Sequence, residues 1–392
     1  MNYKICFRFY SNKWFLFQVY LLNLHLIKMK NENKKSALHE KTGIAQPEIV
    51  DSNSALQIQS FRRTQPSAKD LVDGILSGKI VDLSRAITLI ESKNIEHFEK
   101  ASKIISACLP FANKSVRIGI TGVPGVGKST FIEAFGLYLT SIGKKVAVLA
   151  VDPSSTISHG SILGDKTRMQ ELVQNPNAYI RPSASGETLG GVTRKTRETI
   201  ILCEAAGFDV IIIETVGVGQ SETMVHGMVD FFLLLKIAGA GDELQGIKRG
   251  IMEMADAIFI NKTDGDNIFK SKLAKTEFGR ALHFFPAKKS GWTPIASTCS
   301  AVTNEGIDQV WKTILNYLTL VESNNYFAEK RQEQNQNWML ETINEQLQSR
   351  FYNNIKINEL LVENQKMVLE NKITPFAGAE KLLTEYFKNN IS

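Results

Sequence analysis

The chain has 392 residues, of which 43% are apolar, so it can form one large domain or two smaller domains around a sizeable core. Its 46 basic and 40 acidic residues leave a net charge of only +6, and no basic stripe with interleaved aromatic residues is present, which argues against nucleic-acid binding. The four cysteines form no CxxC pair, which favours a reducing compartment and argues against a cysteine metal site.

The first predicted region, residues 1–66, is an N-terminal extension without a folded core. Its apolar stretch from Trp14 to Ile27 is interrupted by polar residues and is shorter than the about 20 residues that a membrane-spanning helix needs. No small-residue cleavage site follows, and arginine and serine are too rare for a mitochondrial transit peptide. We therefore expect translation to begin at Met29, a flexible arm to follow, and the protein to be cytoplasmic without membrane contact.

The next regions are predicted to be helical in 67–112, a nucleotide-binding domain in 113–322 and helical again in 323–392. Apolar residues recur at helical spacing in the first of these, which indicates amphipathic helices packed on the main domain. The central region alternates helical stretches with continuous apolar runs, a pattern typical of βαβ units around a parallel sheet. The five predicted strands are 116–120, 146–151, 210–213, 231–237 and 257–260. The C-terminal helical region could form a lid on the core or a dimerisation arm.

A phosphate-binding loop of the pattern G-x-x-x-x-G-K-[ST] lies between the first predicted strand and a predicted helix, as this motif requires. Glycines let successive backbone N–H groups surround phosphates, and the helix N-terminus adds partial positive charge. Lys128 is expected to place its charge at the β- and γ-phosphates during catalysis, and the Ser129 hydroxyl to bind magnesium. The predicted nucleotide-binding residues of this loop are Gly122, Val123, Pro124, Gly125, Val126, Gly127, Lys128, Ser129 and Thr130. The predicted fold class is therefore α/β, a P-loop NTPase with a mostly parallel central sheet flanked by helices, plus helical N- and C-terminal extensions.

A guanine-binding motif, N-K-x-D, follows the last predicted strand and consists of Asn261, Lys262 and Asp264. The Asp264 carboxylate can accept hydrogen bonds from guanine N1 and the exocyclic amine, whereas adenine would leave it unpaired. A later loop with Ser300 and Ala301 is predicted to bring a backbone amide to guanine O6, with an ordinary polar turn as the alternative.

Two carboxylates, Asp152 and Glu214, each end a predicted strand, so both are expected at the carboxyl edge of the sheet beside the phosphates. Magnesium prefers hard oxygen ligands and keeps several waters, so we predict that these carboxylates bind it directly or through water. Helix capping is the alternative for each. The small-residue segments 154–169 and 239–248 are predicted switch loops, with plain surface loops as the alternative.

Together these segments resemble the methylmalonyl-CoA mutase-associated GTPases, the MeaB/ArgK group, over roughly residues 67–350. The most specific are 214–222 and 239–248, because the P-loop and N-K-x-D motifs occur in any GTPase. The resemblance implies a homodimeric GTPase that acts as chaperone and gatekeeper of an adenosylcobalamin-dependent acyl-CoA mutase, for which methylmalonyl-CoA mutase is the expected client. Isobutyryl-CoA mutase is another possible client.

The resemblance also implies roles for residues that the motifs alone do not assign. Asp165 would join Asp152 and Glu214 in the phosphate–magnesium site and take part in catalysis. Asp242 and Lys248 would belong to a catalytic third switch. Since Val218 stands where many small GTPases have a water-orienting glutamine, we expect slow intrinsic hydrolysis that a partner accelerates.

Three other functions remain open at this point. A metal-insertion GTPase of the same fold branch usually has a histidine- or cysteine-rich segment, whereas the six histidines of this chain are not clustered. An ATP-dependent kinase that serves amino-acid transport conflicts with the guanine-binding motif. A scaffold that binds GTP without hydrolysing it conflicts with the complete set of Lys128, Ser129 and Asp152.

Overall fold

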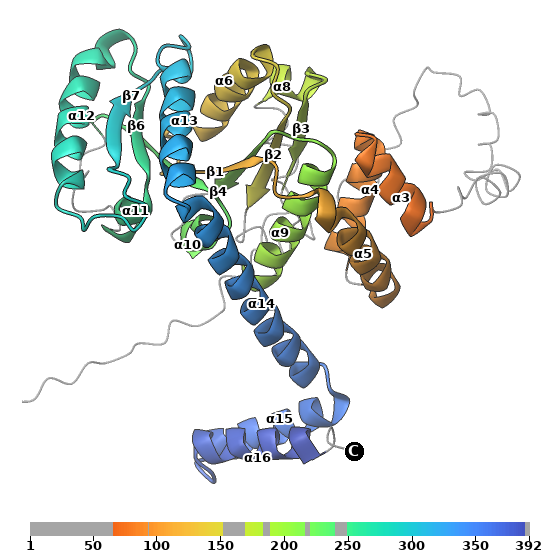
Figure 1. Ribbon diagram of the computed structural model, residues 1–392. Helices are drawn as coiled ribbons and strands as arrows, with labels where there is room; N and C mark the ends of the chain where they lie inside the picture. Colours follow the sequence, from red (N-terminus) through yellow and green to blue (C-terminus); the bar gives the residue numbers. More distant parts are fainter. Residues whose placement is uncertain are drawn as a thin grey trace, which may run out of the picture. The chain divides into compact units, whose positions relative to one another are not determined.

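Seven parallel strands form the central sheet in the part of the chain that the computed structural model describes, in the order β3-β2-β4-β1-β5-β6-β7 (Figure 1). Each pair of adjacent strands is parallel, so crossovers rather than hairpins connect the strands. The strands are β1 (Val116–Gly122), β2 (Val146–Val151), β3 (Ala178–Arg181), β4 (Val210–Thr215), β5 (Phe231–Ile237), β6 (Ala257–Asn261) and β7 (Ile295–Thr298).

The described residues are 66–92, 94–151, 169–182, 189–215, 220–239 and 249–388. They belong to the second of two units into which the chain divides, Met1–Thr64 and Gln65–Ser392. The predictions for residues 1–65, including a start at Met29, lie outside the described residues. Within the described ranges, no helix combines the length and apolar character needed to cross a membrane.

All five predicted strands are present as β1, β2, β4, β5 and β6, and the predicted α/β class with a parallel sheet is confirmed. The two strands that the sequence pattern did not predict, β3 and β7, lie at the two edges of the sheet. Their residues are mostly only half-buried, unlike the fully buried residues of β4. An edge strand is covered less completely, so its sequence needs no continuous apolar run.

Helices precede, follow and connect the strands, and their bounds are as follows. They are α3 (Ala68–Leu76), α4 (Ile80–Glu91), α5 (Ile95–Cys108), η1 (Leu109–Phe111), α6 (Lys128–Ser141), α8 (Gln170–Gln174), α9 (Leu189–Ala205), α10 (Gln220–His226), α11 (Arg249–Met254), η2 (Gly265–Asn267), α12 (Ile268–Leu282), α13 (Ile307–Ser323), α14 (Tyr326–Tyr352), α15 (Ile355–Leu369) and α16 (Pro375–Lys388). The predicted helical extensions before and after the sheet are therefore confirmed. The domain boundaries drawn from the sequence stay predictions.

The two faces of the sheet pack against different helices, because successive strand residues point to opposite sides. In β4, Ile211 and Ile213 belong to a buried cluster shared with α3, α4, α5 and α9. Val210 and Ile212 of the same strand belong to a cluster shared with α6 and α13. Burial of large aliphatic and aromatic side chains on both faces stabilises the sheet by about 1.5–3 kcal/mol for each fully buried side chain.

The N-terminal helices begin with a capping box that fixes where α3 starts. The Ser67 hydroxyl accepts a hydrogen bond from the Asp70 backbone N–H at 3.1 Å, and the Asp70 carboxylate accepts one from the Ser67 N–H at 2.8 Å. This arrangement satisfies two N–H groups that a helix start would otherwise leave unpaired. Leu71 and Ile75 of α3 then point into the core, which confirms the predicted amphipathic character.

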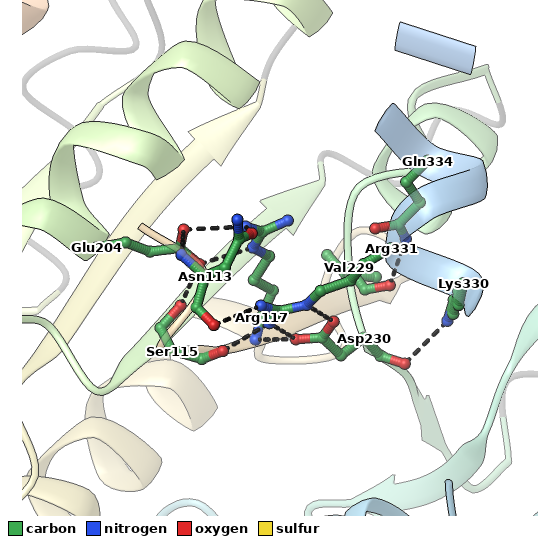
Figure 2. A network of polar contacts seen from close by, with 9 residues as sticks. All are labelled: Asn113, Ser115, Arg117, Glu204, Val229, Asp230, Lys330, Arg331 and Gln334. Carbon is green, nitrogen blue, oxygen red and sulfur yellow. Dashed lines mark hydrogen bonds and ion pairs between the residues drawn. The ribbon is translucent and has the colours of Figure 1, made fainter. Parts of the chain in front are cut away.

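A buried network of charged and polar groups joins α14 to the amino ends of β1 and β5 (Figure 2). The Arg331 guanidinium on α14 donates to both carboxylate oxygens of Asp230, at 2.9 and 2.7 Å. It also donates to the backbone carbonyls of Asn113 and Ser115, at 3.0 and 2.7 Å. Because the same guanidinium bonds segments before β1 and before β5, it fixes the position of α14 at this edge of the sheet.

A second arginine completes the network from within β1. Arg117 donates from Nε and Nη2 to the two carboxylate oxygens of Glu204 on α9, each at 2.9 Å, and its backbone N–H donates to Asp230 at 2.8 Å. Burial alone would raise the pKa of Asp230, but hydrogen bonds from Arg331 and the charges of Arg331 and Arg117 more than offset this and lower the pKa. The pair with Arg331 therefore remains ionised and intact at neutral pH.

We predict that Arg331→Met lowers the free energy of unfolding by about 3–5 kcal/mol, because it leaves the buried Asp230 carboxylate without its main partner. Urea denaturation at neutral pH measures this difference. Lys312→Met serves as the control, since it breaks only an exposed helical ion pair with Asp308, and such pairs add little to stability. Equal losses in the two variants would contradict the structural role of Arg331.

Candidate nucleotide site

The P-loop connects the carboxyl end of β1 to the first turn of α6, in the strand-to-helix context that the sequence predicted. Gly125 and Gly127 have φ angles of 84° and 92°, a region that residues with a Cβ rarely adopt. At Gly122, an added Cβ would lie 2.7 Å from the Leu235 carbonyl oxygen of β5. The loop conformation therefore depends on glycine at all three positions, while Val126 is fully buried beneath it.

Lys128 folds back over this loop from the start of α6, and its ammonium group donates to the Gly122 carbonyl oxygen at 2.8 Å. Burial lowers the pKa of Lys128, and the carboxylates of Glu214 and Glu222 act in the opposite direction. Glu214 is buried near the end of β4, where it pairs in register with Ile120 of β1. The lysine and these carboxylates therefore lie at the same edge of the sheet.

Three further polar residues at this edge were not singled out from the sequence: Thr121, Thr215 and Glu222. The Thr215 hydroxyl donates to the Thr121 hydroxyl at 2.8 Å, and the Thr121 hydroxyl reaches a Glu222 carboxylate oxygen at 3.5 Å. Glu222 lies on α10, is 1% exposed and also accepts from the Ser221 hydroxyl at 3.1 Å. A buried carboxylate directly after a glycine-rich segment was the signal that could have identified it.

The Asn261 side chain connects the P-loop to the loop after β7. Its amide nitrogen donates to the Val126 carbonyl oxygen at 2.9 Å, and its amide oxygen accepts from the Ala301 backbone N–H at 3.2 Å. Next to it, Lys262 has a φ of 59° and donates through its ammonium group to the Gly125 carbonyl oxygen at 2.9 Å. The N-K-x-D motif therefore supports the P-loop directly, in addition to its predicted role toward guanine.

Asp264 and the loop after β7 also meet at this edge. The Ser300 hydroxyl donates to an Asp264 carboxylate oxygen at 2.5 Å and accepts from the Thr303 backbone N–H at 3.2 Å. Ser300 is fully buried, whereas Asp264 is half-buried. The buried hydroxyl of Ser300 therefore orients the Asp264 carboxylate, which still borders solvent. The structure thus brings Asn261, Lys262, Asp264, Ser300 and Ala301 together.

Some of the remaining predicted site residues lie within the described part of the chain, and others lie outside it. Ser129 is half-buried in the first turn of α6, while Val123, Pro124 and Thr130 are exposed. Asp152, Asp165, Asp242 and Lys248 lie outside the described residues, as do nearly all of the two predicted switch loops, 154–169 and 239–248.

A magnesium ion at this site would need few protein ligands. Within the described ranges, no group of three or more His, Cys, Asp or Glu side chains could hold a metal ion. Magnesium bound to nucleotide phosphates uses one or two carboxylates and keeps water in its other positions. A hydroxyl at Ser129, in the first turn of α6, and a buried carboxylate at Glu214, near the end of β4, fit that requirement.

Comparisons with known proteins agree with this arrangement. The family model described as "Methylmalonyl Co-A mutase-associated GTPase MeaB" matches residues 83–356. The GTPase ArgK of Escherichia coli is 44% identical over 339 residues, which cover 86% of this chain and 99% of that protein. The Mus musculus protein described as methylmalonic aciduria type A homolog, mitochondrial, is 43% identical over 326 residues, which cover 81% of this chain and 79% of that protein.

One solved structure supports the fold directly. A crystal structure described as a LAO/AO transport system kinase matches with a TM-score of 0.65 and 37% identity, covering 82% of this chain and 97% of that one. A match of this extent confirms the predicted P-loop fold.

We predict that Asn261→Ala weakens nucleotide binding by about tenfold or more. The substitution leaves the Val126 carbonyl and the Ala301 N–H without their partner, at about 1–3 kcal/mol for a buried group, and tenfold corresponds to about 1.4 kcal/mol. Titration calorimetry with GDP measures the change. Asn358→Ala, on the exposed side of α15, is the matched control and should bind as the unmodified chain does. Unchanged affinity of Asn261→Ala would show that the bridge is dispensable.

Proposed function

The chain belongs to the methylmalonyl-CoA mutase-associated GTPase family and is a GTPase; from this premise we propose that it serves as the chaperone and gatekeeper of an adenosylcobalamin-dependent acyl-CoA mutase. GTP hydrolysis would be coupled to loading and protection of the mutase cofactor, with methylmalonyl-CoA mutase as the expected client. The observation that carries the proposal is the family match over residues 83–356, which includes the whole P-loop and guanine-side assembly.

Guanine selectivity is supported by the position of Asp264. Its carboxylate stands at the end of the N-K-x-D motif, oriented by the buried Ser300 hydroxyl. A carboxylate held in this way can accept both N–H groups of guanine, and adenine offers no such pair. The same observation favours GTP over ATP, and therefore favours a GTPase over the kinase activity that the description of the solved relative names for that protein.

For hydrolysis, we assign the phosphate side of the site to Lys128 and the magnesium side to Ser129, Glu214, Asp152 and Asp165. Magnesium, when bound, would neutralise phosphate charge. Lys128 stands at the start of α6, where its ammonium group can exchange the Gly122 carbonyl for a phosphate oxygen. Turnover that persists unchanged in EDTA would contradict the metal assignment.

We also propose that α14–α16 form a dimerisation arm. Apolar side chains are exposed along these helices. A contact between two copies of the chain would remove them from water. They are Met339, Leu340, Ile343, Leu347, Ile355, Val362, Leu369, Phe376 and Phe387. Sedimentation equilibrium of the full chain should then give twice the chain mass.

We predict that Asp264→Asn exchanges guanine preference for xanthine preference. An asparagine amide can donate to the xanthine C2 carbonyl and accept from N1–H, whereas toward guanine it would oppose the exocyclic amine with its own NH₂. GTP affinity should fall at least tenfold, and XTP affinity should rise above that of the unmodified chain. Competition binding with GTP, XTP and ATP measures this, and equal affinity of the unmodified chain for ATP and GTP would exclude guanine recognition.

The functional test is stimulation of GTP turnover by a purified adenosylcobalamin-dependent methylmalonyl-CoA mutase. Coupling between two binding sites is reciprocal, so a client that prefers the GTP state must also change nucleotide affinity. We expect the mutase to raise turnover several-fold, and Lys248→Ala to remove most of this rise while leaving basal hydrolysis nearly intact. A mutase that changes neither turnover nor nucleotide affinity would exclude the proposed role, whereas full stimulation of Lys248→Ala would exclude only the role of that lysine.

A further inference from the structure

An exposed apolar stripe runs along α12, the helix beside β6 and β7 at one end of the sheet (Figure 1). Phe269 is 79% exposed and Leu273 is 55% exposed, and they stand one helical turn apart on the same face. Phe284, the second residue after the helix, is 82% exposed. Large apolar side chains gathered in this way mark interaction sites more often than isolated ones do.

The fold itself does not require this stripe. The opposite face of α12 already carries the side chains that pack on the sheet, namely Ala274, Phe278 and Leu282. They form one buried cluster with Ile258 and Ile260 of β6. Because α12 is already packed through this face, the exposed aromatic and aliphatic side chains are surplus to the core.

Positive charge surrounds the stripe. Lys270, Lys272, Lys275 and Arg280 are all exposed on α12, and Glu277 is the single acidic residue of the helix. Within the described part of the chain, no ion pair neutralises these four basic side chains. The surface is therefore complementary to an acidic partner face that also offers an apolar pocket.

The position of α12 links this surface to the nucleotide. The helix follows Asp264 after the short turn η2, so its first turn is directly connected to the guanine side of the site. Gly239 lies against Lys270, since a Cβ added there would be 4.0 Å from the Lys270 side chain. Gly239 opens the segment 239–248 that we interpret as a switch, so a partner on α12 would lie beside Asp264 and beside the first residue of that segment.

We propose that Phe269, Leu273 and the surrounding basic side chains of α12 form the docking surface for the acyl-CoA mutase, whose contacting face is acidic around an apolar pocket. The proposal rests on the proposed function, because the mutase is the client inferred there. Phe269 would enter the pocket, and Lys270 and Lys272 would pair with carboxylates at its rim. Buried aromatic side chains contribute most to such interfaces, and rim charges contribute mainly to the association rate and to salt dependence.

The test measures the dissociation constant of the full chain with purified mutase holoenzyme, in the presence of a non-hydrolysable GTP analogue. Phe269→Ser with Leu273→Ser should raise the dissociation constant at least tenfold. Lys270→Glu with Lys272→Glu should do the same at 50 mM salt and have a smaller effect at 200 mM salt, since screening weakens exposed charge pairs.

Matched control variants have the same kinds of substitution at exposed positions outside α12. Val81→Ser with Val173→Ser removes exposed apolar side chains from α4 and α8, and Lys103→Glu with Lys114→Glu reverses exposed charges near α5. Both controls should bind the mutase within about twofold of the unmodified chain. Basal GTP turnover and the thermal unfolding midpoint should be unchanged in the α12 variants, which excludes misfolding.

Four outcomes would overturn the proposal. If the unmodified chain binds the mutase and the α12 variants bind equally well, the docking surface is wrong and the chaperone function stands. If the unmodified chain does not bind the mutase, the docking surface and the chaperone function are both wrong. If the α12 variants change the sedimenting mass, the stripe belongs to an interface between copies of this chain. If the unmodified chain binds phosphatidylserine vesicles and the α12 variants do not, the surface contacts a membrane.

Discussion

The parallel hydrogen bonding of β1 to β4 on one side and β5 on the other is the constraint on which the rest of the molecule depends. Parallel strands all end at the same edge of a sheet, so segments far apart in sequence are delivered to one place. The P-loop, Glu214 and the N-K-x-D motif lie at the carboxyl ends of three different strands, and they meet for this reason. The shared direction of the strands therefore determines which segments meet at the site.

The opposite edge of the same sheet carries a different kind of interaction. There, Asp230 and Glu204 are buried and each is paired with an arginine, Arg331 and Arg117 respectively. Ion pairs of this kind cost desolvation energy, and their geometry must be satisfied on all sides. The Arg331–Asp230 pair fixes α14 to the amino end of the sheet, and the Arg117–Glu204 pair fixes α9 there. Attachment of the C-terminal helices and the nucleotide site are therefore located at opposite ends of the strands.

Much of this arrangement could be predicted from the sequence, because its strongest signals are local. The central strands are nearly continuous apolar runs, and the P-loop and N-K-x-D motifs have fixed spacing. The edge strands β3 and β7 were not predicted, because their partly exposed residues do not form a continuous apolar run. The bridge made by Asn261 was also missed, since it depends on two contacts with residues 135 and 40 positions away. Thr121, Thr215 and Glu222 form a site only after their strands and α10 are in place.

The Asn261 bridge also has a consequence for the order of events during synthesis. Its partner Val126 leaves the ribosome 135 residues earlier, and Lys262 reaches back 137 residues to Gly125. A nascent chain that ends before β6 therefore has a complete P-loop sequence, but the Val126 and Gly125 carbonyl groups lack the donors Asn261 and Lys262. Full nucleotide affinity during translation therefore requires the segment around Ala301 to have been synthesised, so completion of this bridge and tight ligand binding coincide in time.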